Sequence, residues 1–185
     1  MAAATTPQVA LDALLEPIST LMPSGESLRR SFTYDQIKEA RRADDPNLAQ
    51  GVWQTDVKRA DWGKVADLCV EALEKKSKDL RIAAWLAEAW LKRHGPSGAA
   101  YGFNLIEGLV DRFWDTLHPP VEDDDLDGRM APLMWINEKL SVELKAVSLT
   151  DPQAQEPEHL TWNDWEKASM LERSGHKPGP DDVTT

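Results

Sequence analysis

Apolar residues recur at helical spacing along most of the chain, and the clearest run follows Asp61. Its apolar residues fall at positions i, i+3, i+4, i+7 and i+8 and are Val65, Leu68, Cys69, Ala72 and Leu73. The charged residues between them lie on the opposite face of a helix. We therefore predict an amphipathic helix with one buried face, and we interpret Cys69 as a small core residue rather than a reactive thiol.

A more uniformly apolar run follows Asp79 and predicts the central helix. Residues 80–91 are apolar on almost every side, and Asp79 stands at the N-cap position. Three basic residues end the run, as favoured at a helix C-terminus, and Gly95-Pro96 follows. We expect the helix to stop at this Gly-Pro pair.

The remaining helices are predicted from shorter or weaker patterns. The longest covers residues 97–117, with apolar residues every three or four positions and a stop at His118-Pro119-Pro120. A run from Leu133 to Val147 has nearly heptad spacing but is too short to predict a coiled coil. Shorter helices are expected over 9–15, over 34–42 and after the N-cap Thr161, and residues 44–55 are expected to form a loop.

These elements define an all-α fold class. We predict a compact multi-helix domain of successive antiparallel helical hairpins, with a short N-terminal helix and a flexible C-terminal tail. The expected division is a flexible N-terminus over 1–8, the helical domain over 9–172, and a linker or tail over 173–185, where Gly, Pro and Asp accumulate.

The charge balance bears on the partners. The 185 residues carry a formal net charge of −11, which repels nucleic-acid phosphates and anionic lipid surfaces. Nucleic acid and membrane insertion are therefore not expected. The single cysteine cannot form an internal disulfide, and we predict a cytoplasmic protein.

One acidic segment partly matches a calcium-binding loop. Residues 123–128 read Asp-Asp-Asp-Leu-Asp-Gly, the opening of an EF-hand loop. The ninth and twelfth positions of that motif are Ala131 and Met134, so the closing glutamate is missing. We interpret the segment as a solvated acidic loop and predict no metal site and no cofactor.

No catalytic motif stands out. The sequence lacks a Gly-x-Ser-x-Gly elbow, a phosphate-binding glycine loop and a His-Glu-x-x-His pair. The histidines are far apart and have no second metal ligand at helical spacing: His94, His118, His159 and His176. We predict no catalytic residue, although an enzyme whose site is assembled from distant residues stays open as a third alternative.

The sequence contains eight tryptophans, which anchor both cores and interfaces. Trp85, Trp90 and Trp114 lie within strongly apolar helices, and we assign them to the core. Trp53 and Trp162 flank predicted loops, so that both a core and an interface role stay open for them.

Three sequence blocks stand out, in this order along the chain: Pro23-Ser24-Gly25-Glu26-Ser27-Leu28-Arg29 with Tyr34, Lys76-Ser77-Lys78-Asp79-Leu80-Arg81, and Trp114-Asp115-Thr116-Leu117-His118-Pro119 with Arg129 and Trp135. Together they resemble the ImpA-related amino-terminal domain of TssA-like proteins from bacterial type VI secretion systems, and the second and third blocks together are specific. The resemblance covers about residues 10–170 and departs from the family pattern at Ala100-Tyr101.

The resemblance implies a non-enzymatic assembly or scaffold role through contacts with baseplate, tube or sheath proteins. It also implies that this chain is an amino-terminal fragment or a truncated member, and that ring formation needs carboxy-terminal sequence. A generic helical adaptor of another complex is the alternative. The expected partner-binding residues lie in two exposed segments: Pro23, Gly25, Glu26, Arg29, Asp123, Asp124 and Asp125.

Overall fold

The computed structural model describes residues 7–44, 57–123, 125–150 and 159–173, and within these ranges the chain is helical, without strands. The all-α prediction is confirmed. No helix in these ranges is long and apolar enough to cross a lipid bilayer. The elements are α1 (Pro7–Leu14), α2 (Phe32–Arg41), α3 (Trp62–Lys75), α4 (Leu80–Phe113), α5 (Asp127–Trp135), a π-helical segment η1 (Ile136–Leu140), α6 (Ser141–Lys145) and α7 (Trp162–Arg173).

Helix α4 consists of two antiparallel segments, 80–94 and 96–113. Gly95 separates them with a non-helical backbone, φ 64° and ψ −148°. The second segment folds back so closely that a Cβ added at Gly102 would lie 2.4 Å from the Cβ of Ala87. The predicted stop at Gly95-Pro96 is therefore confirmed, and the two segments form a tight helical hairpin.

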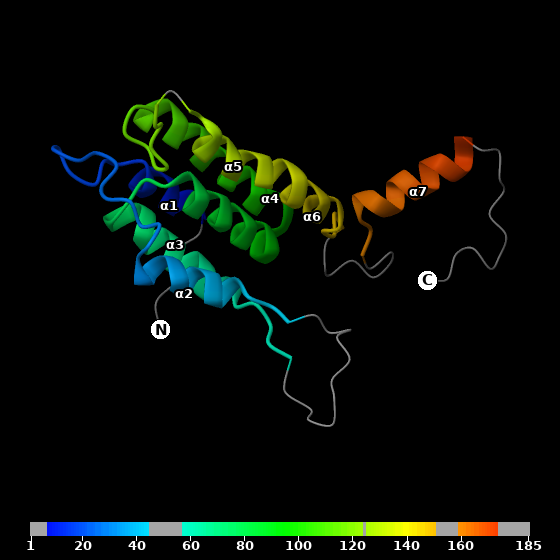
Figure 1. Cartoon of the computed structure of the whole chain (residues 1–185). Coiled ribbons are helices and arrows are strands. Elements are labelled where there is room, and N and C mark those ends of the chain that lie inside the picture. Colours follow the sequence, from blue (N-terminus) through cyan, green and yellow to red (C-terminus); the bar gives the residue numbers. More distant parts are fainter. Residues whose placement is uncertain (1–6, 45–56, 124, 151–158, 174–185) are drawn as a thin grey trace.

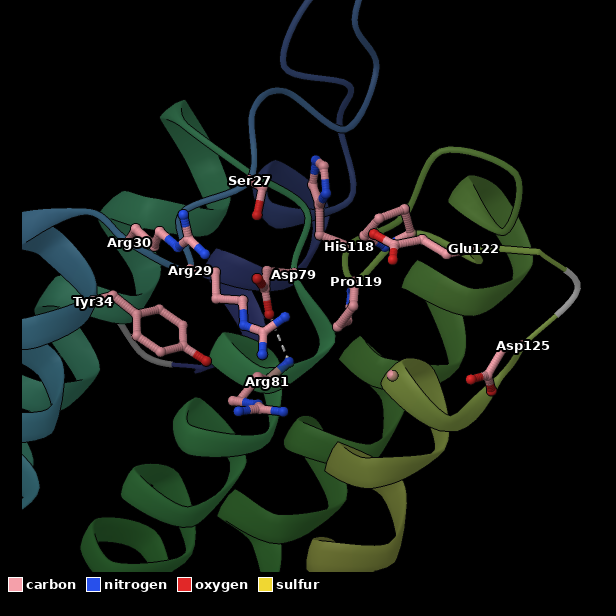
Figure 2. A pocket seen from close by; sticks show the side chains of 12 residues that line it. Ser27, Arg29, Arg30, Tyr34, Asp79, Arg81, His118, Pro119, Glu122 and Asp125 are labelled. Atoms are coloured by element: carbon pink, nitrogen blue, oxygen red, sulfur yellow. Dashed lines mark hydrogen bonds between the residues drawn. The ribbon is translucent and has the colours of Figure 1, made fainter.

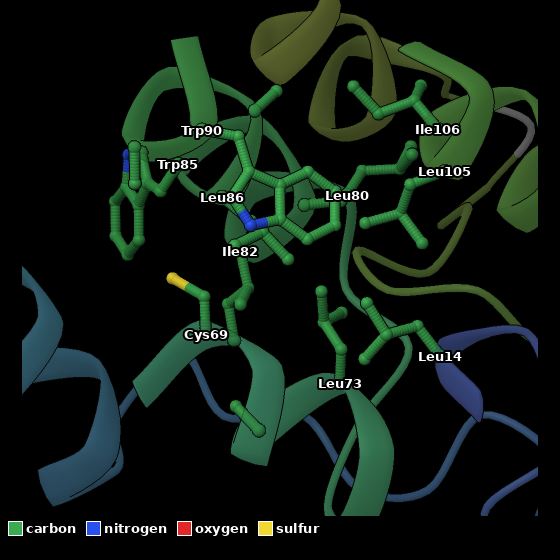
Figure 3. Close-up of a cluster of buried hydrophobic side chains, with 14 of the residues drawn as sticks. Leu14, Cys69, Leu73, Leu80, Ile82, Trp85, Leu86, Trp90, Leu105 and Ile106 are labelled. Carbon is green, nitrogen blue, oxygen red and sulfur yellow. The ribbon is translucent and has the colours of Figure 1, made fainter. Parts of the chain in front are cut away.

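The core lies between α3 and this hairpin (Figure 3). Cys69 and Leu73 from α3 and Leu86 from α4 are fully buried, and Trp90 is 2% exposed. Burial raises the pKa of the Cys69 thiol well above its usual range, so that the group stays protonated. The amphipathic face predicted for α3 and the core roles predicted for Cys69 and Trp90 are confirmed.

A buried ion pair connects α2 to the hairpin. Arg41 of α2 lies 2.6 Å from the carboxylate of Glu88, and both side chains are largely shielded from solvent. The Arg41 guanidinium also packs on the rings of Trp85 and Trp135, at 4.9 and 5.3 Å. This cluster links α2, α4 and α5.

Several predicted boundaries differ from the structure. Helix α1 begins at Pro7, inside the predicted flexible terminus, because proline is accepted in the first turn of a helix. The helix predicted to run to 117 ends at Phe113. The helical run predicted from Leu133 begins at Asp127, whose amide donates to Oδ1 of Asp125 at 2.7 Å.

The assignment of Trp114 to the core is also wrong. Since α4 ends at Phe113, Trp114 lies in the following turn, and its side chain is 42% exposed. Its ring instead stacks on Arg129, with the guanidinium carbon 4.6 Å from the ring centroid. Trp85 at 6% exposed is in the core, as predicted.

Helix α7 lies apart from the other helices in Figure 1 and has no buried residue. Thr161 caps its start as predicted, because the amide of Asp164 donates to Oγ1 of Thr161 while the amide of Thr161 donates to the Asp164 carboxylate. Trp162 and Trp165 are 41% and 55% exposed. Three predictions lie outside the described residues: the role of Trp53, the loop over 44–55 apart from its first residue, and the tail after Arg173.

The different burial of two tryptophans leads to a stability prediction. Replacing Trp90 with alanine should lower the free energy of unfolding by about 3–5 kcal/mol, because a large side chain leaves a packed core. Trp114→Ala should cost clearly less, since part of that ring already contacts water. Urea unfolding of both variants measures the difference, and equal losses would show that the exposure of Trp114 has been misassigned.

Candidate functional site

Three segments distant in the sequence meet at the start of α4. Residues 24–26 pair with residues 76–78, and residue 79 pairs with His118. The amide of Lys78 donates to the carbonyl of Ser24 at 2.8 Å, and the carbonyl of Lys78 accepts from the amide of His118 at 2.9 Å. These backbone bonds hold the three segments side by side.

The side chain of Lys78 adds two further links. Its ammonium, fully buried, donates to the carbonyls of Leu14 at 2.8 Å and of Leu73 at 2.7 Å. These carbonyls lie at the C-terminal ends of α1 and α3, where a cation is favourable. Burial lowers the pKa of Lys78 to about 8. One side chain therefore connects both helix ends to the start of α4.

Gly25 fits the close approach between the first two segments. Its φ is +64°, and a Cβ at this position would lie 2.1 Å from the carbonyl oxygen of Lys76. Its own carbonyl lies 3.1 Å from Nε2 of His118, which must donate because a carbonyl only accepts. Gly25 is therefore an internal structural residue of this junction.

Arg129 holds the chain that leaves α4. Its guanidinium donates to the carbonyls of Trp114 at 2.5 Å, Leu117 at 2.9 Å and Pro119 at 2.9 Å. The side chain is buried, so these bonds compensate for its removal from water. The turn after α4 and the first turns of α5 are fixed to each other by this residue.

An open pocket of about 560 Å³ lies over this junction, and we call it the arginine pocket (Figure 2). One side of it is cationic. The Tyr34 hydroxyl and the guanidinium groups of Arg29 and Arg81 point toward the same region in Figure 2. The residues on this side come from the segment before α2, from α2 and from the start of α4: Ser27, Arg29, Arg30, Tyr34, Asp79 and Arg81.

The opposite side of the arginine pocket is acidic. Glu122 and Asp125 stand there, separated from the arginines in Figure 2 by the chain at His118 and Pro119. Both carboxylates are exposed. The pocket therefore presents opposite charges on its two sides.

The two buried polar groups of the pocket serve the fold. Oδ1 of Asp79 accepts from the amides of Arg81 at 2.8 Å and Ile82 at 3.3 Å and so caps α4, as predicted. Burial, chiefly, raises the pKa of Asp79 above its usual range. Burial and the nearby Asp79 also raise the pKa of Tyr34, although Arg81 within hydrogen-bonding reach opposes the shift. Tyr34 is therefore a neutral hydroxyl.

The guanidinium groups of Arg29, Arg30 and Arg81 gather on one side of the arginine pocket. Among the described residues none of the three forms an ion pair with a carboxylate. Arg41, in contrast, is paired with Glu88. Arg81 lies within hydrogen-bonding reach of Tyr34, whereas Arg29 and Arg30 are exposed, so the pocket presents guanidinium N–H groups to a ligand.

The structure brings two of the predicted partner-binding residues together: Arg29 and Asp125 lie on opposite sides of the arginine pocket. Pro23 and Gly25 are half-buried within the junction, whereas Glu26 is exposed. Asp123 is exposed, with φ +51°, and does not line the pocket. Asp124 lies outside the described residues. A partner-binding role for these residues stays a prediction.

Sequence reasoning did not assign a role to Tyr34, Arg81 or His118. All three belong to the blocks quoted for the family resemblance, which was the available signal. Helical periodicity could not show that they meet, because the pairing of residue 79 with His118 brings distant segments together. Within the described ranges no group of three or more His, Cys, Asp or Glu residues could hold a metal ion.

Comparisons with known proteins agree with the fold and define its class. A family model described as "ImpA, N-terminal, type VI secretion system" matches residues 15–138, more than half of the chain and all of the arginine pocket. The chain belongs to this family of type VI secretion system proteins. The resemblance inferred from the sequence is confirmed.

Two relatives place the chain within the family. It is 28% identical over 112 residues to the type VI secretion system component TssA1 of Pseudomonas aeruginosa, a match covering 60% of this chain and 32% of that protein. It is 37% identical to a solved N-terminal domain, including the conserved ImpA_N region, of the TssA component from Burkholderia cenocepacia. That match has a TM-score of 0.71 and covers 94% of this chain and 68% of the other.

The close approach at Gly25 leads to a second stability prediction. Gly25→Ala should lower the free energy of unfolding by about 1–3 kcal/mol, since alanine is strained at positive φ and its Cβ would clash with a backbone carbonyl. Gly63→Ala is the matched control, because Gly63 lies in α3 with room for a Cβ, and should stabilise by about 0.4–1 kcal/mol. Urea unfolding measures the free energy of unfolding of both variants. A Gly25→Ala variant as stable as the unaltered chain would contradict the structural role of Gly25.

Proposed function

We propose that the chain is a non-enzymatic assembly module of the type VI secretion apparatus. It acts in the cytoplasm by binding baseplate, tail-tube or sheath subunits. The observation that supports the proposal most is the position of the family match, because residues 15–138 include helices α2 to α5 and the whole arginine pocket. The match covers only part of TssA1, so the partners are part of the proposal.

The chemistry of the pocket supports binding rather than catalysis. Its buried carboxylate, Asp79, is occupied by the amides that begin α4. Nε2 of His118 is engaged by the carbonyl of Gly25, and Nδ1 of the same ring is buried away from solvent. A general acid or base must be able to reach a substrate proton, and these two groups are held by structural contacts instead. The unpaired arginines are suited to recognition.

A second exposed surface on α7 also supports a binding role. Trp162 and Trp165 pack together with ring centroids 4.7 Å apart, and Met170 is 68% exposed. Large apolar side chains that remain exposed together are typical of contact surfaces. The bundle and α7 thus offer separate surfaces for protein partners.

The proposal predicts direct binding to subunits encoded by the same genome. The purified chain should bind at least one purified baseplate, tube or sheath subunit saturably in biolayer interferometry, without nucleotide or metal. If none of these subunits binds while a protein from another complex does, the chain is a generic helical adaptor and the proposal is wrong.

A further inference from the structure

The arginine pocket gathers three guanidinium groups, and the carboxylate of Asp79, which lies near Arg81, is occupied by the amides that begin α4. Arg81 is half-buried, and Arg29 and Arg30 line the same pocket without a carboxylate partner. Two other shielded arginines have partners within the fold: the half-buried Arg41 pairs with Glu88, and the buried Arg129 donates to three carbonyls. This contrast indicates that the pocket arginines are available to a ligand.

The donors in the pocket suit a carboxylate. A guanidinium group presents parallel N–H donors that match the two oxygens of a carboxylate. Arg29 and Arg81 lie close enough to Tyr34 to affect the pKa of its hydroxyl, so the three groups surround one region. Because Tyr34 remains a neutral hydroxyl, it adds a donor without adding negative charge.

The acidic side of the pocket restricts which anionic ligands can bind next to the arginines. Glu122 and Asp125 face the cationic side, and the whole chain carries a net charge of −11. A polyanion such as nucleic acid would be repelled by both. A short segment with a carboxylate and a nearby basic residue matches both sides of the pocket, and such complementarity gives specificity.

The cationic side is also held in place before any ligand binds. Arg81 lies in the first turn of α4, directly after the cap made by Asp79. Arg29 lies between Leu28 and Ser31, whose Oγ donates to the Leu28 carbonyl at 2.8 Å. A site on fixed backbone loses less entropy on binding than a flexible one.

We propose that the arginine pocket binds an acidic segment of a partner protein. A carboxylate of the segment contacts Arg29 and Arg81, and a basic residue of the segment faces Glu122 and Asp125. This inference rests on the proposed function, since it names the chemistry of the partner segment that the assembly module recognises.

Blocked tripeptides test the chemistry of the ligand. We expect acetyl-Glu-Ala-Lys-amide to shift the NMR signals of Arg29, Tyr34 and Arg81 saturably, with a Kd of about 1 mM for so small a ligand. The Gln-Ala-Lys and Glu-Ala-Gln peptides, which each lack one charge, should bind more weakly. The proposal is overturned if no signal of the pocket shifts saturably, if the Gln-Ala-Lys peptide binds equally well, or if inorganic phosphate binds as tightly as the first peptide.

Two charge reversals test the place of binding. Arg29→Glu should weaken binding of the first peptide about tenfold or more, because it turns an attraction into a repulsion. Arg93→Glu is the matched control, since Arg93 is exposed on α4, lies outside the pocket and changes the net charge equally. Equal weakening by both variants would overturn the proposal. Thermal unfolding of the two charge-reversal variants verifies that they fold. Arg81→Gln, which removes the positive charge, should also weaken binding of the first peptide.

The same variants separate this inference from the proposed function. Loss of subunit binding in Arg29→Glu but not in Arg93→Glu supports the inference. If both variants bind the subunit like the unaltered chain, the pocket is not the contact, whereas the assembly role stands. If no secretion subunit binds the unaltered chain, the proposed function fails, and the peptide titration still decides whether the pocket accepts a carboxylate.

Discussion

The buried ammonium group of Lys78 is the interaction on which the rest of this structure depends. The ammonium group donates to the carbonyls of Leu14 and Leu73, in the last turns of α1 and α3. The backbone of Lys78 pairs with that of Ser24 and His118. Burying a charge is unfavourable unless it is well hydrogen-bonded, and the lowered pKa reflects that cost. Since these partners come from the ends of α1 and α3, from the segment before α2 and from the chain after α4, Lys78 fixes how the four segments meet.

The arginine pocket follows from this arrangement. Backbone pairing at the junction places the segment before α2, the start of α4 and the chain after α4 around one space. The cations that stabilise the junction are Lys78 and Arg129, both buried and bonded to carbonyls. Arg29 and Arg81 are not needed for that purpose. The site therefore exists because Lys78 and Arg129 hold the junction together and leave Arg29 and Arg81 facing the pocket.

Local patterns in the sequence predicted what depends on local structure: the buried face of α3, the cap at Asp79 and the break at Gly95. The end of α4 was missed because the carbonyls after Phe113 are bound by Arg129, which lies on another helix. The exposure of Trp114 follows from that same early end. The pocket could be predicted only in part, since Arg29 and Asp125 were chosen as exposed residues, whereas their meeting depends on the pairing of distant segments.

The most direct test of this account is the free energy of unfolding of the Lys78→Met variant. Lys75→Met is the control, because Lys75 is exposed at the end of α3. Methionine has similar volume but leaves two buried carbonyls without a donor, at a cost of about 1–3 kcal/mol each. We expect urea unfolding to show a free energy of unfolding lowered by that cost, and we expect faster amide hydrogen exchange in α1 and in residues 24–26. The control should show neither change. A Lys78→Met variant as stable as the original chain, with unchanged exchange, would contradict the account.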